Sequence, residues 1–373
     1  MEHNPLDILF ETVKLGDFTL HNRFIMASLT RCRGDPTNGI PTDLHVQYYS
    51  QRASAGAIFS ECSPIANNAQ SFLGAGGIYT KEQIEGWKKV TQAVHEKGGK
   101  IFIQIWHGGR SVNPEAVGEG IIGPSAIAIR GKSTRTGNEY PVPKEMSKDD
   151  IKLVKEQFRQ GALNAKEAGF DGVELHGANG YLIDTFIRDG SNQRTDEYGG
   201  SIENRCRFCL EVIDILIEVF GCGKVGIKLS PVGRFQDMYD SDPIATYSYL
   251  LKELEKKNIA FVQLMELNEA FKGESAHEAG EKQIAEVCKT LRPFFKNALI
   301  INNNLTPESA AKAIKEGHAD LVSFGRYFIS NPDFIERVKN NWHLAEWDRN
   351  TFYAGGEKGY ADYPNFEKPE ESK

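Results

Sequence analysis

The chain has 373 residues, of which 40% are hydrophobic and 25% are charged, and its formal net charge is −7 at pH 7. This is the composition of a globular protein, and the length allows one large domain or two smaller ones. No block of lysine and arginine stands out, which argues against nucleic acid and anionic membranes as partners. No stretch approaches the roughly 18 apolar residues of a membrane-spanning helix.

The cysteines are spaced neither as a disulfide framework nor as the two pairs of a zinc site. The six are Cys32, Cys62, Cys206, Cys209, Cys222 and Cys288. The N-terminus lacks the basic region and apolar run of a secretory signal. We therefore expect a reducing compartment, the cytoplasm.

Short β-rich runs alternate with amphipathic helical stretches along the whole chain. The predicted strands are 24–28, 57–62, 100–106, 172–175, 224–230, 261–265, 298–302 and 321–324, and 332–340 supplies an eighth helix. Ser147 and Thr306 are typical N-caps of two of the helices. Eight strand–helix units with right-handed crossovers predict an α/β fold, a single closed (β/α)₈ TIM barrel.

The connection after the third predicted strand is too long for a simple turn. Residues 108–146 are rich in glycine, proline and serine, and a barrel loop of this size at the carboxyl end of the strands usually covers the site. We expect one domain over 1–364 with this capping insertion. We expect 365–373 to be a disordered tail, because it is polar and charged.

Three polar side chains follow the fourth predicted strand, separated by small residues. His176 and Asn179 can each donate a hydrogen bond to one oxygen, and Tyr181 can deliver a proton nearby. The carboxyl ends of the strands are where a parallel barrel carries its chemistry. The three therefore predict a catalytic site.

Other polar and small residues end the remaining strands, so that all face the same mouth. They are Ser28, Leu29, Thr30, Cys62, Gln104, Trp106, Lys228, Asn303, Asn304, Gly325 and Arg326. Few carboxylates are among them, since Glu61 and Glu174 lie within strand patterns. A metal site or a paired-carboxylate hydrolase is therefore disfavoured.

The set instead suits a planar polar heterocycle with a phosphate tail. Gln104 offers both a donor and an acceptor to a uracil-like ring edge, and Lys228 can sit beside a ring that develops negative charge. Arg326 follows Gly325 at the end of the eighth strand, and phosphate sites of these barrels are usually built by the loops after strands seven and eight.

Seven sequence segments, in order and at barrel spacing, make the chain resemble the Old Yellow Enzyme family. This is a family of FMN-dependent NADPH dehydrogenases and enone reductases that includes the 12-oxophytodienoate reductases. The segments are LHNR at 20–23, MASLTR at 26–31, QIWHGGR at 104–110, HGANGYL at 176–182, SNQRTDEYGGSIENR at 191–205, GRYFISNP at 325–332 and GYADYP at 359–364. The resemblance covers about 9–364, nearly the whole chain.

The resemblance implies an ene-reductase with bound FMN and with NADPH as reductant. His176 and Asn179 would bind the carbonyl or nitro oxygen of an activated alkene, and Tyr181 would protonate the α-carbon while flavin N5 delivers hydride to the β-carbon. The residues implied to contact FMN are Ser28, Leu29, Thr30, Cys62, Gln104, Lys228, Asn303, Asn304, Gly325 and Arg326. Trp106, Phe72 and Tyr353 would shape the pocket for a small-molecule enone. A monomer and a homodimer are both compatible with the fold.

The chain departs from the family pattern at four places. Ser28 stands where most members have proline, and Cys62 where alanine or glycine is typical. Lys228 replaces the usual arginine, which keeps the charge but loses the forked hydrogen bonding. Asn303-Asn304 replaces a common Gly-Gly, and asparagine tolerates left-handed backbone better than most residues.

Three other functions remain open at this point. Lys228, at the end of the fifth strand, is also placed as the amine of a Schiff-base aldolase. A non-catalytic member would bind flavin without turnover. An FMN enzyme that isomerises double bonds would use the same residues.

Overall fold

The computed structural model describes residues 4–117, 120–133, 137–266, 284 and 286–367. Eight parallel strands close into a barrel in the order β10-β11-β12-β3-β4-β5-β8-β9. They are β3 (Phe24–Met26), β4 (Ala57–Pro64), β5 (Ile101–Trp106), β8 (Gly172–Gly177), β9 (Val225–Leu229), β10 (Phe261–Met265), β11 (Ala298–Asn302) and β12 (Leu321–Phe324). The predicted barrel is confirmed, and each predicted strand ends within two residues of the observed one.

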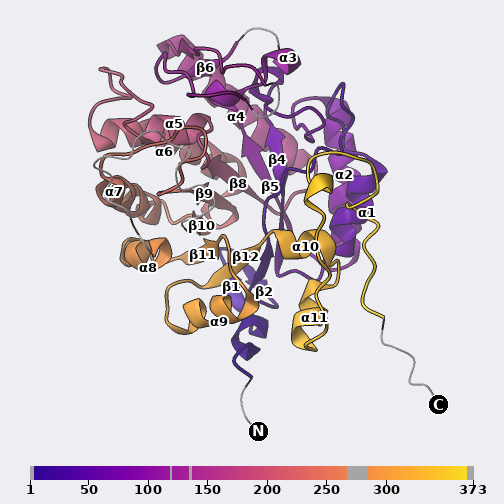
Figure 1. Cartoon of the computed structure of the whole chain (residues 1–373). Coiled ribbons are helices and arrows are strands. Elements are labelled where there is room, and N and C mark those ends of the chain that lie inside the picture. The colour runs from indigo at the N-terminus through magenta and orange to yellow at the C-terminus, as the bar shows by residue number, and fades with distance from the viewer. Residues whose placement is uncertain (1–3, 118–119, 134–136, 267–283, 285, 368–373) are drawn as a thin grey trace, which may run out of the picture.

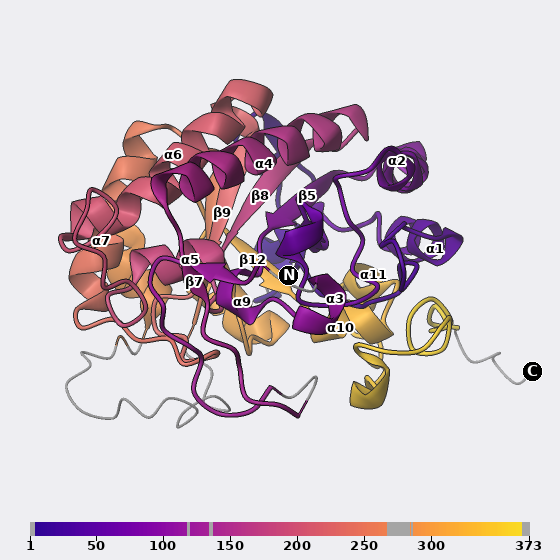
Figure 2. The same cartoon turned by 90° about the horizontal axis from the view of Figure 1, so that it is seen from above.

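Helices surround the barrel, as the view from above shows (Figure 2). They are α1 (Asp43–Gln51), α2 (Lys81–Glu96), α4 (Lys148–Glu167), α5 (Leu182–Ile187), α6 (Ile202–Phe220), α7 (Pro243–Lys256), α8 (Val287–Leu291), α9 (Pro307–Lys315), α10 (Arg326–Ser330) and α11 (Phe334–Lys339). The two predicted N-caps are confirmed, because Ser147 accepts the Asp150 N–H and Thr306 accepts the Ser309 N–H. The predicted last helix, 332–340, is shorter than expected at both ends.

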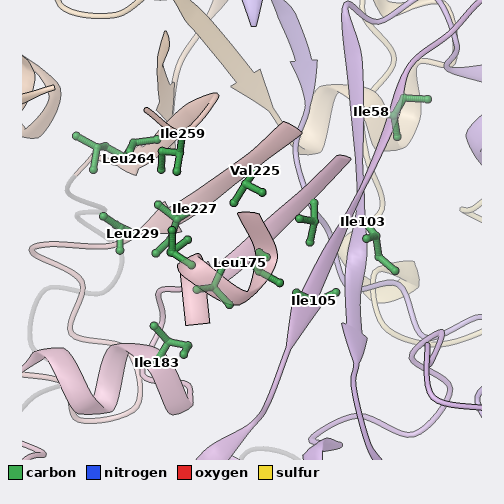
Figure 3. Packing of buried hydrophobic residues seen from close by; sticks show 14 of the residues in the cluster. Ile58, Ile103, Ile105, Leu175, Ile183, Val225, Ile227, Leu229, Ile259 and Leu264 are labelled. Atoms are coloured by element: carbon green, nitrogen blue, oxygen red, sulfur yellow. The ribbon is translucent and has the colours of Figure 1, made fainter. Parts of the chain in front are cut away.

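The strands alternate between an outward apolar face and an inward face. In β5, Ile103 and Ile105 belong to the main core between strands and helices, and Figure 3 shows them with Leu175 of β8 and Ile227 of β9 as members of this cluster. Because successive side chains point to opposite faces, Gln104 must point into the barrel. The same alternation decides which polar residues face the mouth.

A hairpin that was not predicted from the sequence closes the end of the barrel at which the strands begin. Strands β1 (Val13–Leu15) and β2 (Phe18–Leu20) pair antiparallel, and Figure 1 shows them at the lower end. Leu15 and Leu20 join an apolar cluster with residues at the starts of the barrel strands, including Phe59, Phe102 and Phe261. This end of the barrel is apolar, so the polar side chains that could carry chemistry lie toward the carboxyl ends of the strands.

The segment between β5 and α4 forms small elements of its own. It holds α3 (Pro114–Val117) and the strand pair of β6 (Ile122–Gly123) and β7 (Lys144–Glu145), which lie near the upper end in Figure 1. The Arg194 side chain ties this segment to the chain after α5, because it donates to the carbonyls of Pro124 and Met146. Its role as a cap over the site stays a prediction.

The predicted tail at 365–373 lies outside the described residues from 368 onward. No helix in the described part of the chain is both long and apolar enough to span a membrane.

Candidate functional site

Four buried polar side chains form a layer inside the barrel, which we call the polar layer. It consists of Gln104 of β5, Glu174 of β8, Lys228 of β9 and Gln263 of β10. Strand register pairs Gln104 with Glu174 and Lys228 with Gln263. Polar groups so far from water are unfavourable unless they are hydrogen-bonded or serve a ligand.

Glu174 is the centre of the polar layer. Its carboxylate accepts hydrogen bonds from Gln104 Nε2 (2.6 Å) and, across the barrel interior, from Gln263 Nε2 (2.8 Å). The Ser28 hydroxyl also donates to it, at 3.2 Å. Burial raises the pKa of Glu174 to about 7, and the nearby positive charge of Lys228 opposes this rise. Glu174 does lie within a strand, as its sequence pattern predicted, but the pattern did not reveal that its side chain contacts Ser28, Gln104 and Gln263.

Lys228 has a different environment, because its ammonium group is almost wholly buried without a neutralising contact. Its exposed fraction is 6%, and within the described part of the chain it makes no hydrogen bond or ion pair. Burial lowers its pKa, while the negative charge of Glu174 opposes this change. A buried, unpaired ammonium is unfavourable, and an electron-rich ligand atom in the mouth would relieve it.

His176 lies on the next inward position of β8, two residues beyond Glu174. Burial and the charge of Lys228 lower the pKa of His176 well below its ordinary value, so its ring is neutral at pH 7. Its Nδ1 accepts the backbone N–H of Ala178, at 3.3 Å. The remaining proton of a neutral ring is then on Nε2, which makes this atom a hydrogen-bond donor.

The loop after β8 holds Asn179 and Tyr181 in fixed positions. Asn179 has a left-handed backbone, with φ of 61°, and its N–H donates to Ser230 Oγ at 2.9 Å. The N–H of Gly180 donates to Asp184 Oδ2 at 2.8 Å. Asparagine and glycine are the residues that adopt such a backbone with least strain.

A fully buried ion pair between Asp184 and Arg188 holds this loop in place. Asp184 Oδ1 accepts from Arg188 Nε at 3.0 Å and from the Tyr247 hydroxyl at 3.1 Å. The Arg188 guanidinium also donates to the carbonyls of Ser230 and Gly233. The positions of Asn179 and Tyr181 therefore depend on a hydrogen-bond network that joins α5 to the loop after β9.

Aromatic rings form one wall of the mouth. The Tyr181 ring meets Trp106 edge to face at 5.1 Å and His176 at 4.8 Å between ring centroids. Phe72 lies 6.0 Å from Trp106 and stacks with Tyr353 at 6.3 Å. The five rings form a chain of neighbours, which agrees with the predicted grouping of Trp106, Phe72 and Tyr353.

The Tyr353 segment is held by arginines from the other end of the chain. Arg31 donates to the carbonyls of Thr351, Phe352 and Gly359. Arg33 also donates to the carbonyls of Thr351 and Phe352. The residues directly after β3 therefore fix the C-terminal segment that completes the aromatic wall.

The loop after β3 borders the polar layer on another side. Ser28 Oγ accepts from Gln104 Nε2 at 2.7 Å, and Thr30 Oγ1 lies 3.0 Å from Cys62 Sγ. Cys62 faces inward although it is three residues from the inward Phe59, because the register of β4 against β5 shifts between them. The structure thus brings Ser28, Thr30 and Cys62 together.

The predicted phosphate end lies beside the loop after β3. A side chain at Gly325 would come within 3.0 Å of Leu29. Arg326 donates to Asn304 Oδ1 at 2.7 Å and lies over the Trp347 ring at 5.2 Å. Asn303 and Asn304 both have left-handed backbones, with φ of 91° and 52°. The asparagines therefore adopt the conformation that a Gly-Gly pair would allow.

The structure groups the predicted residues around one mouth and adds three to them. Glu174, Gln263 and the anchoring Asp184 were missed, although the alternation of β8 and β10 places the first two on the inward face. Among the described residues, no three histidine, cysteine, aspartate or glutamate side chains are arranged to hold a metal ion.

Comparison with known proteins agrees with this site. The model of the NADH:flavin oxidoreductase / NADH oxidase family matches residues 8–345. The probable flavin mononucleotide-dependent alkene reductase of Leishmania infantum is 44% identical over 368 residues, which cover 96% of this chain and 98% of that protein.

Two solved structures show the same fold along nearly the whole chain. The Old Yellow Enzyme homologue from Zymomonas mobilis has a TM-score of 0.90 and 38% identity, over 96% of this chain and 99% of that one. Morphinone reductase in complex with tetrahydroNAD has a TM-score of 0.87 and 39% identity, over 96% and 98%. The chain therefore belongs to the Old Yellow Enzyme family of FMN-dependent oxidoreductases.

Proposed function

We propose that this protein uses NADPH to reduce the activated C=C bond of α,β-unsaturated carbonyl or nitro compounds. The observation that carries the proposal is the group at the end of β8. His176 is neutral with its Nε2 proton available, Asn179 is held beside it, and the Tyr181 ring packs against both His176 and Trp106. Two neutral donors and a phenol suit a substrate that gains negative charge on oxygen and needs a proton on carbon.

The polar layer fits the ring of FMN. Lys228 offers an unpaired buried charge to an electron-rich ring edge. Gln104 faces the same interior from β5, which is separated from the strand of Lys228, β9, by β8 alone. Ser28, Leu29, Thr30 and Cys62 would lie along the ring. The phosphate would be held by Gly325, Arg326, Asn303 and Asn304, where a side chain at Gly325 would crowd Leu29 at 3.0 Å.

The chemistry that bound FMN would supply is hydride transfer from the nicotinamide to the β-carbon of the substrate. The protein orients the alkene and stabilises charge. His176 and Asn179 donate hydrogen bonds to the substrate oxygen, and these strengthen as charge develops on that oxygen. Tyr181 gives its phenolic proton to the α-carbon. Trp106 and Phe72 would shape the pocket for the alkene, and Tyr353, which is 60% exposed, would form its outer edge.

The test is a visible absorption spectrum of the purified protein under anaerobic conditions. We expect a flavin band that NADPH bleaches and that cyclohexenone then restores. NADH at the same concentration serves as the matched control for the nicotinamide, and we expect slower bleaching with it. A flavin band that NADPH bleaches but no enone or nitroalkene restores would contradict the proposed substrate class. A protein that takes up no FMN would contradict the proposal as a whole.

A further inference from the structure

Ser28 closes a ring of hydrogen bonds with Gln104 and Glu174. Gln104 Nε2 donates to Ser28 Oγ at 2.7 Å and to Glu174 Oε2 at 2.6 Å. The Ser28 hydroxyl donates in turn to the same Oε2, at 3.2 Å. A proline at position 28, as the family pattern has, would supply no hydroxyl, so this ring depends on the residue in which the chain departs from the pattern.

The ring determines what Gln104 offers to a ligand. An amide nitrogen carries two hydrogens, and both are used, one toward Ser28 and one toward Glu174. No described residue donates to Gln104 Oε1. From the sequence we expect Gln104 to offer both a donor and an acceptor, whereas this arrangement leaves only its carbonyl oxygen for a ligand.

Glu174 also balances charge inside the barrel. It is fully buried, it accepts three hydrogen bonds, and its negative charge and the positive charge of Lys228 stabilise each other. Glu174 and Lys228 lie on the neighbouring strands β8 and β9 and are both buried, so that their opposite charges partly offset each other. A negative charge that develops on a flavin ring bound over the polar layer would therefore be attracted by Lys228 and repelled by Glu174.

We propose that Glu174, bonded to Gln104 both directly and through the Ser28 hydroxyl, is a positioning residue of the cofactor site. It fixes Gln104 as the acceptor for the imide N–H of the flavin ring and supplies the counter-charge to Lys228. This inference rests on the proposed binding of FMN over the polar layer. The proposed role has two parts. The orientation of Gln104 is tested at Ser28 through the affinity for FMN, and the charge near Lys228 is tested at Glu174 through the midpoint potential.

Orientation is tested with Ser28→Ala and its conservative partner Ser28→Thr. Loss of the hydroxyl removes one of the two acceptors of the Gln104 amide, and a hydrogen bond of about 1 kcal/mol corresponds to roughly fivefold. We expect the dissociation constant for FMN, measured by fluorescence titration of the apoprotein, to rise about fivefold in Ser28→Ala. Ser28→Thr restores the hydroxyl and should restore wild-type binding.

Charge is tested with Glu174→Gln, which keeps the shape of the side chain and removes its negative charge. Because the new NH₂ group cannot accept a hydrogen bond, the variant also loses an acceptor, so its readout is the midpoint potential and not the affinity for FMN. Without the negative charge, Lys228 stabilises an anionic reduced ring more strongly than before. We expect reduced FMN to gain about tenfold in affinity over oxidised FMN at pH 8.5, where Glu174 is ionised. For a two-electron couple this is a rise of about 30 mV in the midpoint potential, measured by equilibration with a reference dye.

Glu61→Gln is the matched control for removal of a buried carboxylate. Glu61 is also fully buried in a barrel strand, but its side chain accepts from His45 Nε2 at 2.9 Å and makes no hydrogen bond or ion pair with Gln104 or Lys228. We expect its midpoint potential to equal that of the wild type.

Two results would overturn the inference: Ser28→Ala and Ser28→Thr with equal affinity for FMN, or Glu174→Gln with an unchanged potential. If Glu174→Gln does not fold, the Ser28 pair decides alone. A wild-type protein that binds no FMN would contradict the proposed function itself, whereas normal wild-type binding with unaltered variants would contradict only the role of Glu174.

Discussion

Neutralising Asp184 should both destabilise the protein and slow the chemistry at Tyr181. Asp184 is fully buried, and its carboxylate accepts from Arg188, Tyr247 and the N–H of Gly180. Asp184→Asn keeps the shape but leaves the Arg188 charge buried without its partner. Breaking a buried ion pair in this way costs about 3–5 kcal/mol.

The expected shift in melting temperature follows from the size of the chain. An unfolding entropy of about 2.1 cal/mol/K per residue gives roughly 0.8 kcal/mol/K for 373 residues. The loss of 3–5 kcal/mol therefore lowers Tm by about 4–6 °C. Because an asparagine NH₂ group facing Gly180 cannot accept its N–H, the loop that carries Tyr181 also shifts. We expect reoxidation of the reduced enzyme by the enone to slow about tenfold, since misplacement of a catalytic group by about 1 Å has effects of up to 10²-fold.

Thermal unfolding followed by circular dichroism and stopped-flow measurement of the two half-reactions test this expectation. Glu253→Gln is the control, since Glu253 pairs with the largely exposed Lys256 and such surface pairs contribute about 1 kcal/mol or less. An Asp184→Asn protein that melts within 1 °C of the wild type would refute the reasoning. So would an equal slowing of both half-reactions, because only the alkene step uses Tyr181.

Three further predictions concern the same region. Tyr181→Phe keeps the ring packing but removes the proton, so stopped-flow should show alkene reduction slowed about 10²–10⁴-fold with flavin reduction by NADPH intact; equal loss in both would contradict the role. Burial lowers the pKa of His107 to about 3, so between about pH 6.5 and pH 3 only the unfolded state takes up this proton. As the pH falls through this range, the unfolding free energy of the wild type should decrease by about 1.4 kcal/mol per pH unit more than that of His107→Gln. Denaturant titrations at several pH values measure this difference, and equal pH dependence of the two proteins would refute it. Gly180→Ala should destabilise more than Gly98→Ala, because both have left-handed backbones but only Gly180 lacks room for a methyl group, with Met238 Cγ at 2.8 Å; equal Tm values would contradict the crowding.

The barrel could be predicted from the sequence because its strands are buried on both sides and bounded by glycine and polar residues. The runs at 261–265, 298–302 and 321–324 match the observed strands at both ends. The hairpin of β1 and β2 could not be found in this way, since three-residue strands are too short to show a period.

The candidate site was predicted in part, and the missing residues have a common physical cause. His176 and Tyr181 lie within one short motif, so proximity in sequence suffices to group them. The contacts of Glu174 with Ser28 and Gln263 join residues 146 and 89 positions apart. Alternation along β8 would have turned Glu174 inward, but only the closed barrel shows which side chains it meets there.

The arginine contacts to the Tyr353 segment have a consequence for the order in which the protein assembles during synthesis. Arg31 is synthesised long before the carbonyls of Thr351, Phe352 and Gly359 that it binds, because 320 to 328 positions separate them along the chain. Until then a buried guanidinium lacks most of its acceptors, although Tyr48 already offers one. Tyr353 can therefore complete the aromatic wall only after the chain has been synthesised through Gly359, and until then the Phe72 ring lacks its stacking partner.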